Sequence, residues 1–244
     1  MKNFYIFTLL FSVMSCTTTE HNFPIEKRFW TPEDYDITIK EIRYGYKPDE
    51  EIPSFSNPET AIVIKKLVDP ENFKVIVNDK ELGSKYKNEV LSQYFDEWLD
   101  MMKIYTQTDR KDMYVYEKEY LSCWHYGLNL QLDYFGIGIE NAKKSFDDPN
   151  SYSAKVNSQS NSNIVVKNFL IYLDLINEEN SFSNKGKLKM SDGINKYFPI
   201  LISNFSSATN FFKIEDKTQK LLKKVKSPDI KNSLQNLLVL LEQK

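Results

Sequence analysis

Apolar residues recur at helical spacing along most of this chain. Between residues 84 and 106 they follow one another at steps of one, three and four positions, which predicts a helix with one broad apolar face. The next segment, residues 112–135, is apolar on two sides, and a helix of that kind belongs in the middle of a bundle. One side carries Tyr116, Tyr120 and Cys123, and the other carries Tyr114, Leu121, Leu128 and Phe135.

Further helices are indicated by capping residues and by the same spacing. Thr31 with Pro32 opens one, Asn57 with Pro58 another, and Ser227 with Pro228 the last, since these pairs suit the cap and first-turn positions. The expected fold is mainly α, an irregular bundle of about six to eight helices. The remaining predicted helices cover residues 164–176, 193–205 with Asp192 as cap and Pro199 as a kink, and 215–226.

Three segments interrupt this pattern. Phe73, Val75 and Val77 alternate with other residues before an Asn-Asp pair, so the only β-structure expected is a short strand or hairpin near 73–82. Residues 147–163 are rich in Ser and Asn and predict a flexible loop. The glycines of "GIGIEN", residues 136–141, are interpreted as a helix break or cap.

The first residues have the pattern of an export signal. Met1 to Asn3 carry one positive charge, and residues 4–14 are uncharged and largely apolar. This apolar run is much shorter than the ~20 residues that cross a bilayer, which favours a signal peptide over a permanent membrane helix. The run ends in Val13-Met14-Ser15-Cys16.

That ending resembles the lipobox of bacterial lipoproteins, with Met14 departing from its usual pattern. The resemblance implies cleavage before Cys16 and acylation of that residue, with palmitate among its fatty acids, so that several acyl chains anchor the protein stably in a membrane. The style of the sequence, rich in Lys, Asn, Ile, Phe and Tyr, resembles the Bacteroidota, and residues 17–20 offer a single acid after the cysteine. We therefore expect a cell-envelope protein in the outer membrane, facing the periplasm.

The domain organisation follows from this interpretation. Residues 1–15 are the expected signal peptide, residues 16–30 a lipidated tether, and residues 31–244 a single helical domain. Within the tether, Phe29 or Trp30 is the first side chain expected to dock. No family is recognised for the domain.

Charge argues against nucleic acid as a partner. The chain has 32 Lys and Arg against 34 Asp and Glu, and its net charge of −2 becomes −3 when Lys2 is removed with the signal peptide. Only Arg28, Arg43 and Arg110 are arginines, whereas bidentate recognition of bases and phosphates usually relies on arginine.

The chain offers few residues for histidine, cysteine or metal chemistry. With Cys16 acylated, Cys123 has no partner in the chain, and its apolar neighbours predict burial. Cys123 and His125 lie two positions apart, which puts them on opposite sides of a helix and argues against a catalytic pair. One cysteine and one histidine in the domain make a poor zinc site, and we expect no metal, cofactor or catalytic residue.

The function expected is non-catalytic binding of a macromolecule in the envelope, for example of the toxin-immunity type. The proline-rich crossing would supply its contacts through Tyr44, Tyr46, Asp49, Glu50, Glu51 and Phe55. A lysine face of residues 213, 217, 220 and 224 could touch anionic lipid but is interpreted as the solvated side of a helix. The alternatives are a glycan-binding accessory lipoprotein, or a hydrolase using paired carboxylates at Glu33/Asp34, Glu50/Glu51, Asp147/Asp148 or Glu178/Glu179.

Overall fold

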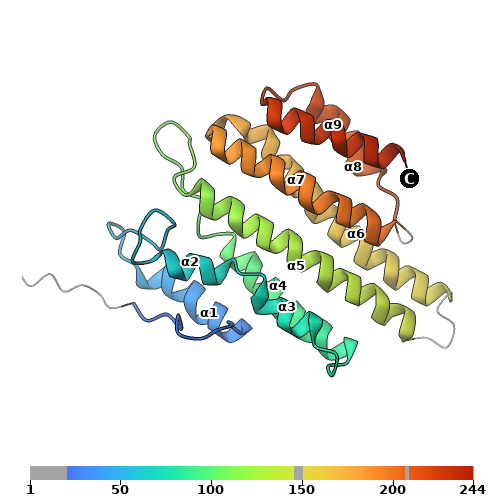
Figure 1. Cartoon of the computed structure of the whole chain (residues 1–244), viewed down its shortest axis with the longest axis horizontal. Helices are drawn as coiled ribbons and strands as arrows, with labels where there is room; N and C mark the ends of the chain where they lie inside the picture. The colour runs from blue at the N-terminus through green and yellow to red at the C-terminus, as the bar shows by residue number, and fades with distance from the viewer. Residues whose placement is uncertain (1–20, 146–150, 207–208, 244) are drawn as a thin grey trace, which may run out of the picture.

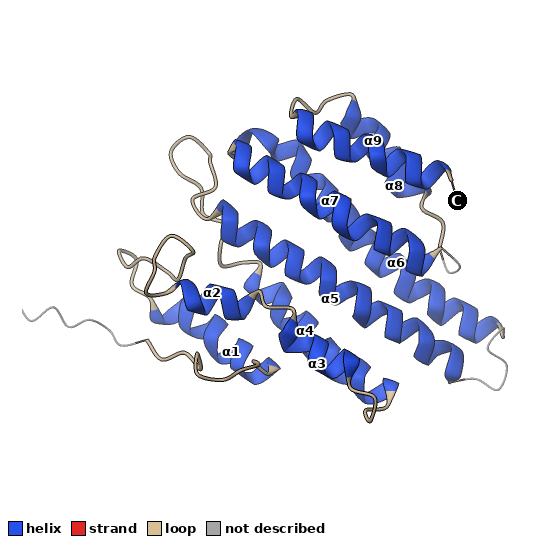
Figure 2. Ribbon diagram, viewed as in Figure 1, coloured by secondary structure: helices blue, strands red, loops and turns tan. Residues whose placement is uncertain are grey.

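The computed structural model describes residues 21–145, 151–206 and 209–243, and it confirms the mainly α prediction. Figure 1 shows the helices in order along the chain, and the described residues contain no strand (Figure 2). None of the described helices is both long and apolar enough to cross a bilayer. The α-helices are α1 (Pro32–Lys40), α2 (Ala61–Leu67), α3 (Glu71–Asn78), α4 (Ser84–Met101), α5 (Glu117–Lys144), α6 (Tyr152–Asp174), α7 (Asn184–Phe205), α8 (Phe212–Leu222) and α9 (Pro228–Glu242), with a π-helical turn at Glu41–Gly45 and a 3-10 segment at Leu175–Ser181.

Helix α5 lies in the middle of the bundle, as its two apolar sides predict. It packs against α4 on one side and against α6 and α7 on the other (Figure 1). Both of its sides are buried, and α8 and α9 join the bundle through α6 and α7. The buried side chains form one continuous hydrophobic cluster that extends from Trp30 to Leu237.

Two glycines allow large side chains to approach the neighbouring helices closely. A Cβ atom at Gly127 of α5 would overlap the indole ring of Trp98 from α4. The same indole donates a hydrogen bond of 2.9 Å to the Cys123 carbonyl, which fixes the ring against the α5 backbone. On α7, a Cβ atom at Gly193 would overlap the Tyr172 hydroxyl.

Asn72 joins the N-terminal segment to the helices around it. Its buried amide accepts a hydrogen bond from the Trp30 backbone and donates to the Tyr35 hydroxyl and the Lys66 carbonyl, at 2.7–2.8 Å. Tyr94 of α4 donates to the carbonyls of both Trp30 and Asn72. Trp30 is fully buried, which confirms that it docks, and residues 21–30 run back beside α1 (Figure 1).

The strand expected near 73–82 is wrong, because residues 71–78 form α3. Phe73 is fully buried and Val77, one helical turn later, packs at the edge of the core, whereas Val75 is not part of the core cluster. The Asp69 side chain accepts a hydrogen bond from the Glu71 backbone, which supports the start of the helix. The alternation of apolar residues was therefore coincidental, and the spacing of four was the informative one.

The flexible loop expected at 147–163 is also wrong for residues 152–163, which form the first half of α6. Ser151 caps this helix by accepting a hydrogen bond from the Ala154 backbone. Its buried positions are Ala154, Ser158 and Ser162, one helical turn apart, and these small residues face the bundle without any large apolar side chain. Asp147 and Asp148 lie outside the described residues.

Two predicted helix boundaries fall inside continuous helices. The glycines at 136 and 138 lie within α5, so they neither break nor cap it. Asp192 lies within α7, which instead begins after Ser183, whose hydroxyl accepts from the Gly186 backbone. Glu117 of α5 holds this start in place, because its carboxylate accepts hydrogen bonds from the backbone and hydroxyl of Ser183. Pro199 lies inside α7.

Replacing Gly127 with Ala should destabilise the protein by about 1–3 kcal/mol, because the added methyl group forces Trp98 away from α5. Gly136 is a matched control on the same helix, since a Cβ atom there meets nothing within 4 Å. Gly136→Ala should therefore stabilise the helix by roughly 0.5–1 kcal/mol. Urea unfolding of both variants measures the difference, and equal effects of the two would refute the close contact between α4 and α5.

Candidate functional site

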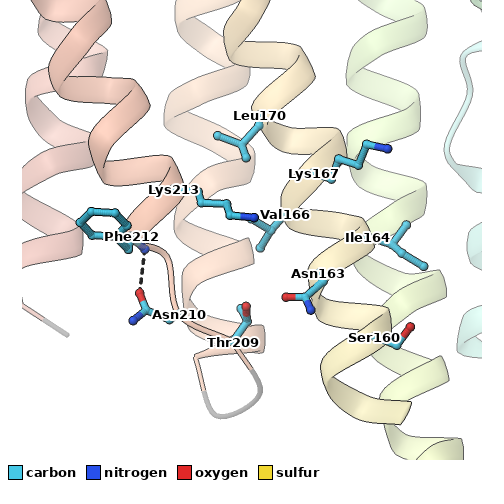
Figure 3. A pocket seen from close by; sticks show the side chains of 10 residues that line it. All are labelled: Ser160, Asn163, Ile164, Val166, Lys167, Leu170, Thr209, Asn210, Phe212 and Lys213. Carbon is cyan, nitrogen blue, oxygen red and sulfur yellow. Dashed lines mark hydrogen bonds between the residues drawn. The ribbon is translucent and has the colours of Figure 1, made fainter. Parts of the chain in front are cut away.

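Two pockets share Phe212 in their lining, and one of them is a groove between α6 and the start of α8 (Figure 3). Its volume is about 550 Å³. Helix α6 lines it with Ser160, Asn163, Ile164, Val166, Lys167 and Leu170, and the start of α8 with Thr209, Asn210, Phe212 and Lys213. This α6–α8 groove thus combines an apolar surface with amide and ammonium groups.

Phe212 is placed in the groove by the start of α8. The Asn210 side chain accepts a hydrogen bond of 2.7 Å from the Phe212 backbone, as shown by the dashed line in Figure 3. The neighbouring Phe211 is buried, whereas the Phe212 side chain points outward and is 67% exposed. A large aromatic side chain that is exposed beside other apolar groups can anchor a contact with a partner protein.

Lys167 and Lys213 give the groove a positive charge. Neither forms an ion pair with any described residue, whereas Lys217 pairs with Asp174 and Lys220 with Asp216 further along α8. The predicted lysine face of residues 213–224 is therefore not uniform, because two of its members are neutralised locally. An unpaired ammonium beside an apolar surface suits a ligand that carries both a carboxylate and an apolar side chain.

The six residues expected to bind a partner differ in their exposure and in their contacts within the chain. Tyr44 is 72% exposed and Asp49 is also exposed. Glu51 accepts a hydrogen bond from Ser54, and Lys118 covers the ring of Phe55 at 4.5 Å. Tyr46 and Glu50 contact His21, and Arg43 lies over the Tyr44 ring at 5.1 Å, so five of the six side chains have partners within the chain.

His21 lies between two carboxylates. Its Nδ1 is 2.7 Å from Glu41 and its Nε2 is 2.8 Å from Glu50, and its ring stacks on Tyr46 at 3.8 Å. A neutral imidazole has one N–H, whereas two carboxylate acceptors require two, so this geometry is that of an imidazolium ion. Burial lowers the pKa of His21, but the hydrogen bonds and charges of Glu41 and Glu50 outweigh it, and the pKa is raised. Residues 21–30 of the expected tether are therefore fastened to the domain.

Cys123 is buried, as predicted, and its burial raises the pKa of the thiol. No hydrogen bond connects it to His125, whose ring instead contacts Tyr172 and Tyr197. Burial, together with nearby Lys189, lowers the pKa of His125 to about 4.

The paired carboxylates serve structural contacts in the described residues. Asp34 pairs with Lys27 and caps α1 with Thr31, and Glu178 accepts a hydrogen bond from Tyr114. Glu179 accepts from the backbones of Lys226 and Ser227. Across residues 21–145, 151–206 and 209–243, no three His, Cys, Asp or Glu side chains gather in a set that could hold a metal ion.

Comparison with known proteins gives no relative: no family model, no curated protein and no solved structure matches this chain. The groove therefore has to be interpreted from its own residues. The sequence pattern does not single out Phe212, because the helix that it predicts begins only at residue 215. Phe211 and Phe212, directly after polar "SSATN", were the available signal.

The His21 contacts should make stability depend on pH. Because the folded-state pKa is raised, the stabilisation is fully present below the ordinary histidine pKa of about 6.5 and is lost as the pH rises through the higher folded value. His21→Gln should cost on the order of 1 kcal/mol near pH 6 and less near pH 9, as measured by urea unfolding.

An NMR titration of the imidazole provides the control. The His21 pKa should exceed 6.5 in the unaltered protein and fall in Glu50→Gln, which keeps only Glu41 as acceptor. A His21 that titrates at or below 6.5 would contradict the double contact.

Proposed function

We propose that this chain is a lipid-anchored protein of the cell envelope whose helical domain binds a protein partner in the α6–α8 groove without catalysing a reaction. The observation that carries the proposal is the exposed Phe212 in a groove that Lys167 and Lys213 also line (Figure 3). Neither lysine has an ion-pair partner among the described residues. Aromatic side chains surrounded by polar groups are common anchors of protein interfaces.

The groove favours a partner segment in which an apolar side chain lies next to carboxylates. The apolar side chain would pack on Phe212 and Leu170, and a carboxylate would accept hydrogen bonds from Lys213, with Lys167 at the rim of the groove (Figure 3). Inhibition of an incoming toxin, the immunity role expected from the sequence, is one function that such a surface could serve, since it needs a shaped surface and no active site.

Anchoring through acylated Cys16 would keep this domain at the membrane. Only four residues separate Cys16 from His21, which the structure fastens to Glu41 and Glu50. A chain of that length spans at most roughly 18 Å, so the domain would lie directly on the membrane surface. The location proposed is the outer membrane, facing the periplasm.

Cys16→Ser tests the anchor. The variant should lose palmitate labelling and move from the membrane fraction to the soluble fraction. Without Cys16 the mature protein carries no acyl chain to hold it in the membrane. A variant that stays in the membrane would show that the uncleaved apolar segment, rather than lipid, holds the protein.

A photo-crosslinking amino acid at position 212 tests the groove in the native envelope. It should give a discrete protein adduct, which mass spectrometry identifies, whereas the same amino acid at exposed Tyr86 of α4 should give none. Lys167→Glu combined with Lys213→Glu should abolish the adduct by reversing the charge of the groove. Adducts of equal yield at both positions, or an adduct insensitive to charge reversal, would contradict the proposed site.

A further inference from the structure

A second, smaller pocket lies on another part of the molecule, between α5, α7 and the turn that joins α2 to α3. Its volume is about 240 Å³, enough for a small ion with some of its water. Ser122, His125 and Asn129 line it from α5, and Lys189, Lys196 and Tyr197 line it from α7. Val68 and Pro70 form the third wall. None of these residues contributes to the α6–α8 groove.

The pocket has two ammonium groups and no carboxylate in its lining. Lys189 is half-buried and donates its hydrogen bonds to uncharged oxygens, the Lys118 carbonyl and the Ser122 hydroxyl. Burial, reinforced by the charge of Lys118, lowers the pKa of Lys189. Lys196 lies over the Tyr197 ring at 5.1 Å, and neither lysine has an ion-pair partner among the described residues. An anion would supply the missing countercharge.

The acidic residues near this pocket do not supply a countercharge for Lys189 and Lys196. Glu119 is buried and accepts a hydrogen bond of 2.5 Å from the Phe55 backbone. Asp69 accepts from the Glu71 backbone, and Asp192 is exposed on α7. Asp192 and Glu119 favour the charged form of Lys189, but burial and Lys118 outweigh them.

The protonation state of the His125 ring favours a ligand that can donate a hydrogen bond to it. The Tyr172 hydroxyl donates to the Met190 carbonyl at 3.0 Å, so we assign Nε2–H of His125 as the donor in their contact of 3.2 Å. A backbone hydrogen bond with Lys189 also favours a protonated ring nitrogen on His125, because it acts to raise the pKa of this residue against the larger effect of burial. A neutral ring protonated at Nε2 has an unprotonated Nδ1, which accepts hydrogen bonds. Gly193 keeps this arrangement possible, because a Cβ there would overlap both the Tyr172 hydroxyl and Nε2.

We propose that this pocket binds hydrogen phosphate, with Lys189, Lys196 and the Asn129 amide donating to its oxygens and its one P–OH donating to His125 Nδ1. Hydrogen phosphate matches both requirements, since it is a dianion that retains a proton. Sulfate has the same charge and shape at neutral pH but no proton, and a phosphodiester, as in lipid headgroups, has neither the second charge nor the proton. The pocket therefore distinguishes these ions by a single hydrogen bond, as buried polar sites can.

Isothermal titration of the full chain in detergent at pH 7.5 with inorganic phosphate, sulfate and dimethyl phosphate tests this assignment. Phosphate should bind at one site, and sulfate and dimethyl phosphate should bind at least about tenfold more weakly, the effect of losing one hydrogen bond in a polar pocket. NMR of the imidazole should show the His125 ring signals shift with phosphate while those of His21 do not.

Two lysine variants locate the binding. Lys196 is exposed, so Lys196→Gln should fold normally and weaken phosphate binding about tenfold, the loss of one charge-assisted hydrogen bond. Lys185→Gln removes an equally exposed charge from α7 outside the pocket and should leave binding unchanged.

Three results would overturn the proposal. An absence of phosphate binding would refute the site, and equal weakening by the two lysine variants would show an attraction to general surface charge. Equal affinities for phosphate and sulfate would refute the hydrogen bond to His125 and with it the assignment of hydrogen phosphate. These results do not depend on the photo-crosslinking at position 212, so the phosphate site and the partner-binding groove are tested separately.

Discussion

The contact between Trp98 and Gly127 is the constraint on which the arrangement of this bundle depends. The indole lies on the α5 backbone where any side chain would exclude it, and its N–H is bonded to the Cys123 carbonyl. Because protein interiors are close-packed, this one approach sets the separation of α4 and α5. The opposite side of α5 is then free to pack against α6 and α7.

Both candidate binding places take their geometry from that central helix. The pocket uses Ser122, His125 and Asn129 directly, all within three turns of α5. The groove depends on α5 indirectly, because α5 supports α6, and α6 forms one wall while α8 forms the other. A rigid support of this kind pre-organises a surface, which lowers the entropic cost of binding.

The sequence predicts the long helices that bury many large residues, and it misses the short α3 and the first half of α6, which buries small residues. The segments around Trp98 and Leu128 were clear because bulky apolar side chains repeat there at helical spacing. The first half of α6 was not, because its buried positions are Ala154, Ser158 and Ser162, which are typical of a polar loop in composition. Packing against α5, rather than local preference, makes that segment helical.

The sites were less accessible to prediction than the fold. The partners of His21 lie 20 and 29 positions away, so nothing local showed that the expected tether was docked. His125 was correctly separated from Cys123 by helix geometry, but its approach to Lys189 depends on how α5 packs on α7. Tyr44 and Asp49 are exposed as a partner surface requires, whereas Tyr46, Glu50, Glu51 and Phe55 are engaged within the chain.

Native-state hydrogen exchange of α5 tests the central role of this helix most directly. The amides from Leu121 to Leu132, buried between α4 and the α6–α7 pair, should exchange only through global unfolding and show the highest protection in the chain. The amides of α9, at the edge of the bundle, should be less protected (Figure 1). If α5 exchanged faster than α9, it could not be the support that holds the groove and the pocket in place.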